Sequence, residues 1–239
     1  LSFIAIPEPH LRKAGHEKEK FSHSPWNFRH TVLGVIGIFV YVGIEIGIPG
    51  TLNFYLADPT EKGAGLLANG AAIGGAIAAI YWLLMLVGRS ASSVISGKVA
   101  TRTQLIVVSA TAICFILIAI FTPTEITVSM PGYSVENGFE MASVPVSALF
   151  LVLCGLCTSI MWGGIFNLAV EGLGKYTAQA SGIFMMMVVG GGIFPLLQQF
   201  ISDAVGYMAS YWLIIALLAY LLFYGLVGCK NVNKDIPVE

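Results

Sequence analysis

Charged residues are scarce in this sequence. Asp, Glu, Lys and Arg make up 10% of its 239 residues, whereas they make up about 25% of an average soluble domain. Hydrophobic residues account for 56%, and the mean hydropathy is +0.83. A soluble protein of this size could not cover its surface with so few charges. The composition therefore predicts a membrane protein.

Other missing features exclude several functions. The net charge is −1, so nothing favours a nucleic-acid partner. Gly172-Leu-Gly-Lys175 lacks the spacing and the Ser/Thr of a phosphate-binding loop, which argues against a nucleotide-driven pump. Cys154 and Cys157 lie inside a hydrophobic stretch without a second pair, and the four His residues have no Cys partners. We expect no enzyme activity, no metal site and no cofactor, with an ion gradient as the energy source.

Six long stretches are hydrophobic and poor in charge. Each has at least about 20 residues, the length that an α-helix needs to cross a bilayer. Gly and Pro within them are compatible with helices, because neighbouring helices satisfy the freed backbone groups. We predict an all-α membrane protein in contact with lipid, with six transmembrane helices at Thr31–Ala57, Gly63–Gly88, Thr103–Thr124, Met141–Val170, Tyr176–Ser202 and Ala204–Cys229.

The rest of the chain is organised around this bundle. Residues 1–30 are predicted to form a cytoplasmic linker that starts with the end of a preceding helix, so we expect a piece of a longer protein. Residues 31–229 form the six-helix bundle and residues 230–239 a cytoplasmic tail. The longest outer loop, Pro123–Glu140, divides the six helices into two triplets.

Basic residues predict the orientation. If the spans alternate, all Lys and Arg except Lys62 fall on one side, and positive charge favours the cytoplasm. Both ends of the chain are then cytoplasmic. The residues on that side are Arg12, Lys13, Lys18, Lys20, Arg29, Arg89, Lys98, Arg102, Lys175, Lys230 and Lys234.

Two spans contain a weak point in the backbone. The first has Pro49-Gly50 and the fourth has Gly163-Gly164, in corresponding positions of the two triplets. Paired interruptions are typical of a transporter built as a three-plus-three inverted repeat, with its binding site nearby. Ordinary helix packing is the alternative, because Gly and Pro are common in membrane helices.

Glu45 is the only acid inside any of the predicted spans, and it lies near the middle of the first. A carboxylate there is costly unless it faces the protein interior or water, or takes up a proton. We interpret it as an acceptor for sugar hydroxyls or as part of a proton pathway; a structural hydrogen bond to a neighbouring helix is the alternative. Tyr41 and Asn53 extend a polar stripe along the same helix.

Four further side chains suit a sugar. Gln198 and Gln199 follow Pro195 in the fifth span, and an amide both donates and accepts hydrogen bonds. Asn167 and Trp162 lie in the inner half of the fourth span, where an indole offers an apolar face to a pyranose ring. Bonding between helices or anchoring at the interface explains these residues equally well.

A cytoplasmic gate is a separate hypothesis. Arg89 and Glu171 are predicted where the second and fourth spans meet the cytoplasm, as an ion pair or a network with Lys98 or Lys175. The alternatives are an arginine that reaches toward the membrane surface and a pair between Glu171 and Lys175 on one helical turn.

Several segments resemble a known family. The stretch Phe166-Asn-Leu-Ala-Val-Glu-Gly-Leu-Gly-Lys-Tyr-Thr-Ala-Gln-Ala-Ser-Gly182 is similar to a signature of the fucose–galactose–glucose:proton symporters of the major facilitator superfamily. Three shorter segments are also similar: Tyr41-Val-Gly-Ile-Glu45, Val87-Gly-Arg-Ser90 and Gly191-Gly-Ile-Phe-Pro-Leu-Leu-Gln198, the last with Asp203. One departure is Gly163-Gly164, where the family usually has Pro-Thr.

The resemblance implies the second half of a twelve-helix fold in a bacterial inner membrane. It also implies proton-coupled uptake of a monosaccharide such as glucose, galactose or fucose by alternating access. The partner would be an N-terminal six-helix half that carries acids for proton coupling. A membrane sugar sensor or assembly subunit on the same fold, and a carrier or exporter of another polar solute, remain alternatives.

Overall fold

The structure of the protein, a computed structural model, describes residues 23–66, 69–95, 97–233 and 235–237. Within these ranges six helical segments are long and apolar enough to cross a membrane, as the sequence predicts. Most of residues 1–30, and with them the predicted linker, lie outside the described residues. The elements are η1 (Pro25–Asn27), α1 (Arg29–Ala57), α2 (Gly70–Ile95), α3 (Thr101–Phe121), β1 (Thr127–Ser134), β2 (Gly138–Pro145), α4 (Val146–Thr158), α5 (Met161–Val170), η2 (Gly174–Tyr176), α6 (Thr177–Met186), η3 (Met187–Val189), α7 (Gly190–Val205), α8 (Tyr207–Phe223) and η4 (Tyr224–Gly228).

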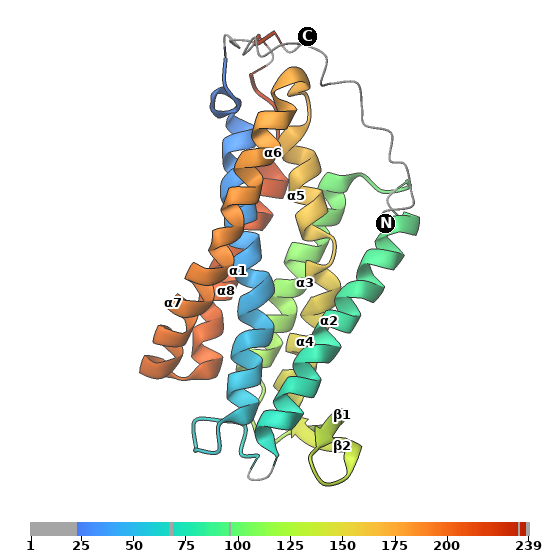
Figure 1. Cartoon of the computed structure of the whole chain (residues 1–239), viewed down its shortest axis with the longest axis vertical. Helices are drawn as coiled ribbons and strands as arrows, with labels where there is room; N and C mark the ends of the chain where they lie inside the picture. The colour runs from blue at the N-terminus through green and yellow to red at the C-terminus, as the bar shows by residue number, and fades with distance from the viewer. Residues whose placement is uncertain (1–22, 67–68, 96, 234, 238–239) are drawn as a thin grey trace, which may run out of the picture.

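Helix α1 is the most buried span; α2, α4, α5, α7 and α8 pack against it, whereas α3 packs on α4, α5 and α8 (Figure 1). The fourth span consists of α4 and α5, the fifth of α6, η3 and α7, and the sixth of α8 and η4. The backbone N–H of Arg29 donates to Asn233 Oδ1 over 3.0 Å, so the beginning of α1 and the segment after the sixth span lie at the same end. An even number of spans requires this arrangement.

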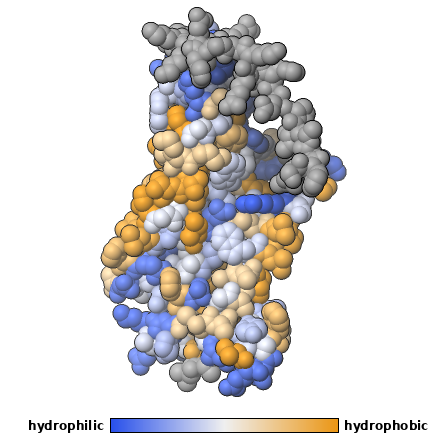
Figure 2. All heavy atoms as spheres, in the orientation of Figure 1, coloured by the Kyte–Doolittle hydropathy of each residue, from blue (hydrophilic) through white to orange (hydrophobic). Residues whose placement is uncertain are grey.

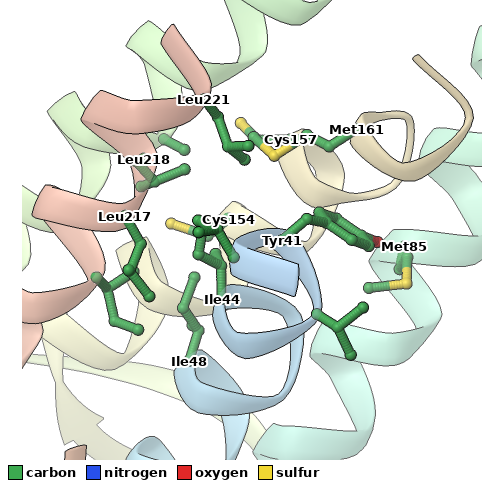
Figure 3. Packing of buried hydrophobic residues seen from close by; sticks show 14 of the residues in the cluster. Tyr41, Ile44, Ile48, Met85, Cys154, Cys157, Met161, Leu217, Leu218 and Leu221 are labelled. Atoms are coloured by element: carbon green, nitrogen blue, oxygen red, sulfur yellow. The ribbon is translucent and has the colours of Figure 1, made fainter. Parts of the chain in front are cut away.

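The core is built where α1, α4 and α8 meet. Figure 3 shows Ile44 and Ile48 of α1 facing the leucines of α8, with Cys154 between them. Two glycines bring α1 against the fifth span. A Cβ atom at Gly43 would overlap the ring of Phe194, and one at Gly190 would overlap the carbonyl of Phe39. Packing of this kind is the main attraction between helices in lipid.

The outer loop differs from the all-helical prediction. Its residues form an antiparallel β-hairpin, β1–β2, at the end opposite the beginning of α1 and the end of the sixth span. Alternate residues such as Met130, Ala142 and Val144 face the protein, which is the two-residue period of a strand. The fourth span therefore begins at Val146 and not at Met141. The second span is also shifted, because α2 begins at Gly70 and extends to Ile95.

The expected backbone interruptions lie elsewhere. Helix α1 continues through Pro49, so the predicted break in the first span is wrong. The fourth span breaks at Ser159 and Ile160, before the two glycines, and the fifth narrows to a 3₁₀ turn at Met187–Val189. A proline removes one backbone donor, and neighbouring groups compensate in a packed membrane helix. Next to Pro49, the Tyr211 hydroxyl of α8 donates to the carbonyl of Ile48 over 2.8 Å and ties the two helices together at this point.

Candidate functional site

A cavity of about 520 Å³ lies beside α1, at the level of Glu45. Four helices and the break in the fourth span contribute to its wall. Figure 2 shows hydrophilic residues across the middle of the face that α1, α2 and α5 present, with hydrophobic residues on both flanks. We call this space the Glu45 cavity; it is lined by Glu45, Arg89, Ser92, Thr101, Gln104, Leu105, Ser159, Ile160, Trp162, Gly163, Gly164 and Asn167.

An ion pair forms one wall of the Glu45 cavity. Arg89 Nη2 lies 3.5 Å from Glu45 Oε1, and the two side chains are 55% and 16% exposed. Glu45 is therefore largely enclosed, whereas Arg89 remains open to the cavity. The nearby cation compensates the cost of a carboxylate at this depth, because a charge inside a membrane protein requires a partner or water. The pair still presents acceptor and donor atoms to a ligand.

The break between α4 and α5 is held by three side chains. The Tyr41 hydroxyl donates to the carbonyl of Thr158 over 3.2 Å, and Arg89 Nε donates to the carbonyl of Ser159 over 3.3 Å. The Tyr81 and Thr158 hydroxyls lie 2.9 Å apart. Carbonyls at the end of a helix lack partners within that helix. These side chains supply partners and connect Arg89 to the backbone of the break.

Helix α5 presents an aromatic and an amide to the cavity. The Trp162 ring is stacked on Phe166, with centroids 5.4 Å apart and planes 5° apart, and Phe166 meets Phe184 of α6 edge-on. The indole is thereby fixed in position. Asn167 is exposed, and a Cβ atom on Gly163 would have open space around it. This part of the wall therefore has room for a ligand.

The other predicted sugar ligands do not line the Glu45 cavity. Tyr41 is fully buried, and its hydroxyl donates to the Thr158 carbonyl at the helix break. Asn53 packs against α2 at Gly74. Gln198 is buried between α1 and α8 and donates to Ser210 Oγ over 3.4 Å, and Gln199 donates to Thr51 Oγ1 over 3.0 Å. Of the seven predicted residues, the structure brings together Glu45, Trp162 and Asn167.

The predicted gate pair is not formed. Arg89 contacts Glu45 in place of Glu171, because α2 continues for six residues past Arg89. At 1.5 Å per residue, that is about 9 Å from the helix end. Lys98 is exposed in the turn before α3, and the Lys175 ammonium lies 5.7 Å above the ring of Tyr176. The four gate candidates therefore do not form one cluster.

Glu171 lines a second cavity of about 790 Å³, at the end where the sixth span finishes. Arg102 and Lys230 line it as well. Thr101 and Asn167 belong to the walls of both cavities. The Glu45 cavity thus continues toward that end of the molecule.

Sequence reasoning missed four polar residues of the cavity wall: Ser92, Thr101, Gln104 and Ser159. Ser and Thr are common in membrane helices and gave no signal. Gln104 is a lone amide near the start of the third span, so the reasoning applied to Gln198 could have identified it.

Comparisons with known proteins find sugar transporters. The chain is 36% identical over 214 residues to a glucose/galactose transporter of Brucella abortus, which covers 89% of the chain and 46% of that transporter. A segment of 78 residues, 33% of the chain and 18% of the relative, is 36% identical to the L-fucose-proton symporter of Escherichia coli. Over most of its length the chain is thus similar to sugar transporters. No family model matches it.

A solved structure has the same fold as this chain. A crystal structure of the major facilitator superfamily transporter FucP, in the outward conformation, matches with a TM-score of 0.65 and 21% identity. The match covers 82% of this chain and 42% of FucP. The predicted resemblance to these transporters and the predicted fold are thus confirmed. The chain spans about half the length of the glucose/galactose transporters that it matches.

Proposed function

We propose that the chain is the C-terminal half of a bacterial inner-membrane transporter that takes up a monosaccharide together with protons. The observation that carries the proposal is the Glu45–Arg89 pair on the wall of a cavity that also holds Trp162 and Asn167. Carboxylate, guanidinium and amide groups match the donors and acceptors of sugar hydroxyls. The names of the relatives, glucose/galactose transporter and L-fucose-proton symporter, support a hexose or deoxyhexose as substrate and the proton as the coupled ion.

A six-helix partner completes the site in this proposal. Alternating access in such transporters is the rocking of two bundles around a site between them. One bundle supplies half of the ligands and no opposing gate. We therefore expect residues 1–239 alone to insert into a membrane without transporting sugar. Co-expression with the partner half should restore accumulation in proteoliposomes under an imposed proton gradient, and accumulation by residues 1–239 alone would contradict this.

Uptake measurements on the complete transporter test the function. Glu45→Gln should weaken sugar affinity or alter the pH dependence of uptake, because it removes a charge that both the sugar and Arg89 contact in this proposal. Ile118→Val, on an exposed part of α3, is the matched control and should leave both unchanged. Unaltered uptake kinetics for Glu45→Gln across neutral and mildly acidic pH would give Glu45 a purely structural role.

The orientation has its own test. Both ends of the chain should be cytoplasmic, with the hairpin in the periplasm. Asn137 is exposed at the hairpin tip, so a cysteine at this position should react with an impermeant reagent in intact cells. Reaction only after the cells are permeabilised would reverse the orientation.

A further inference from the structure

An apolar groove lies next to the Glu45 cavity. It has a volume of about 370 Å³ and runs between α2 and α3, with α4 as its floor. The floor is close because α2 touches α4 at Gly88, where a Cβ atom would overlap the Ser159 side chain. We call it the α2–α3 groove; it is lined by Gly88, Ala91, Ser92, Val99, Thr103, Gln104, Val107, Val108, Leu156, Ser159 and Ile160.

The groove and the cavity share part of their walls. Ser92, Gln104, Ser159 and Ile160 line both spaces. The break between α4 and α5 therefore separates a polar compartment from an apolar one. A ligand in the Glu45 cavity that is larger than the cavity would extend into the groove at this junction.

Two polar side chains at the junction already donate hydrogen bonds within the protein. The Ser159 hydroxyl donates to the carbonyl of Leu156 over 2.6 Å, and Gln104 Nε2 donates to the carbonyl of Val99 over 2.8 Å. A second sugar ring in the groove would lose hydrogen bonds to water and would find few replacements, because most of the lining is apolar. A hydrocarbon group would gain from burial against Val107, Val108 and Leu156. The groove therefore favours an apolar extension.

We propose that the Glu45 cavity and the α2–α3 groove together form a site for a glycoside whose sugar is joined to an alkyl or aryl group. This rests on the proposed function for the sugar portion. The sugar lies beside Glu45, Arg89 and Trp162, and its apolar group passes Ile160 into the groove. Such a glycoside binds more tightly than the free sugar, as a larger substrate or as an inhibitor that occupies both compartments.

Competition binding tests this site on the complete transporter in lipid nanodiscs. Glucose and its methyl, butyl and hexyl glucosides, each below its micelle concentration, compete with radiolabelled glucose. A partly open groove should tighten binding about twofold per methylene, or roughly 30-fold from methyl to hexyl, which is less than full burial would give. Equal affinity along the series would overturn the proposal. Failure of glucose, galactose and fucose alike to bind would overturn the proposed function as well.

A variant whose new side chain fills the groove shows how much the groove contributes to glycoside affinity. Val107 lines the groove and does not line the Glu45 cavity, and it is 56% exposed. Val107→Trp should abolish the gain with chain length and leave glucose affinity unchanged, whereas Ile118→Trp on the same helix should change neither. Ala91→Leu fills the opposite wall and should act in the same way. If chain-length dependence persists in both groove variants, as it would if the alkyl groups only partition into lipid, the groove is not the site.

Discussion

Two polar regions inside the bundle differ in what they face. Around Glu45 and Arg89, side chains of α1, α2 and α5 border open space. Around Gln198 and Gln199, side chains of α7 fit against α1 and α8, and a Cβ atom on Gly47 would approach Gln198 Oε1 to 2.6 Å. Both regions look alike in the sequence, as isolated polar residues in hydrophobic helices. The comparison teaches that binding capacity depends on the space next to a polar group.

The largest effect is expected where the cavity loses its cation. Arg89→Met should lower sugar affinity by about 10- to 100-fold, because a hydrogen bond to a charged group contributes about 1.5–3 kcal/mol. It also leaves Glu45 without its partner. Equilibrium binding of radiolabelled sugar measures the loss, and Arg89→Lys should recover part of it. If Arg89→Met retained its sugar affinity, the ion pair would be a structural contact, like those around Gln198, and not part of the binding site.

Gly163 tests whether the space itself matters. Its Cβ position is open and lies on the cavity wall. Gly163→Val should reduce sugar affinity by about tenfold with little change in thermal stability, because the added methyls occupy the ligand's volume. Gly155→Val is the matched control in the same span. Its Cβ would meet the Tyr81 carbonyl, so it should lower stability, as overpacking does. Similar stability losses in both variants would contradict the open cavity.

Tyr41 links the two kinds of region, because it is buried but supports the cavity wall. Tyr41→Phe removes the hydrogen bond to the Thr158 carbonyl, which should cost about 1 kcal/mol of stability. Sugar affinity should fall only slightly. Thermal unfolding and sugar binding of the same preparation give both values, and a large loss of affinity with unchanged stability would show direct contact with the sugar.

The smallest effect is expected in the packed region. Gln198 Oε1 is buried without a hydrogen-bond partner in the described residues, and Ser210 Oγ already donates to the carbonyl of Tyr207. Gln198→Leu should therefore change stability by less than about 1 kcal/mol and leave sugar affinity unchanged. A clear loss of affinity would place Gln198 at the binding site, as the sequence suggested.

Much of the fold was predictable, because hydrophobic length is a property of consecutive residues. The six spans followed from it, the resemblance followed from short motifs, and Glu45 stood out as a lone acid in its helix. The errors were local. The hairpin β1–β2 was missed because its alternating pattern, Thr127–Ser134 paired with Gly138–Pro145, looked like a polar loop joined to the start of a helix. The position of Arg89 was misjudged because polar residues near the end of α2 concealed where the helix stops.

The sequence by itself determined that the chain crosses a membrane six times and carries a costly carboxylate within its first span. Desolvation of charge and the thickness of the bilayer impose both conclusions on any folded form. Only the tertiary structure decided that Arg89 is the partner of Glu45, that the fourth span breaks at Ser159, and that Gln198 is packed while Asn167 borders a cavity. Each of these depends on which helix faces which, and such contacts join residues far apart in the chain.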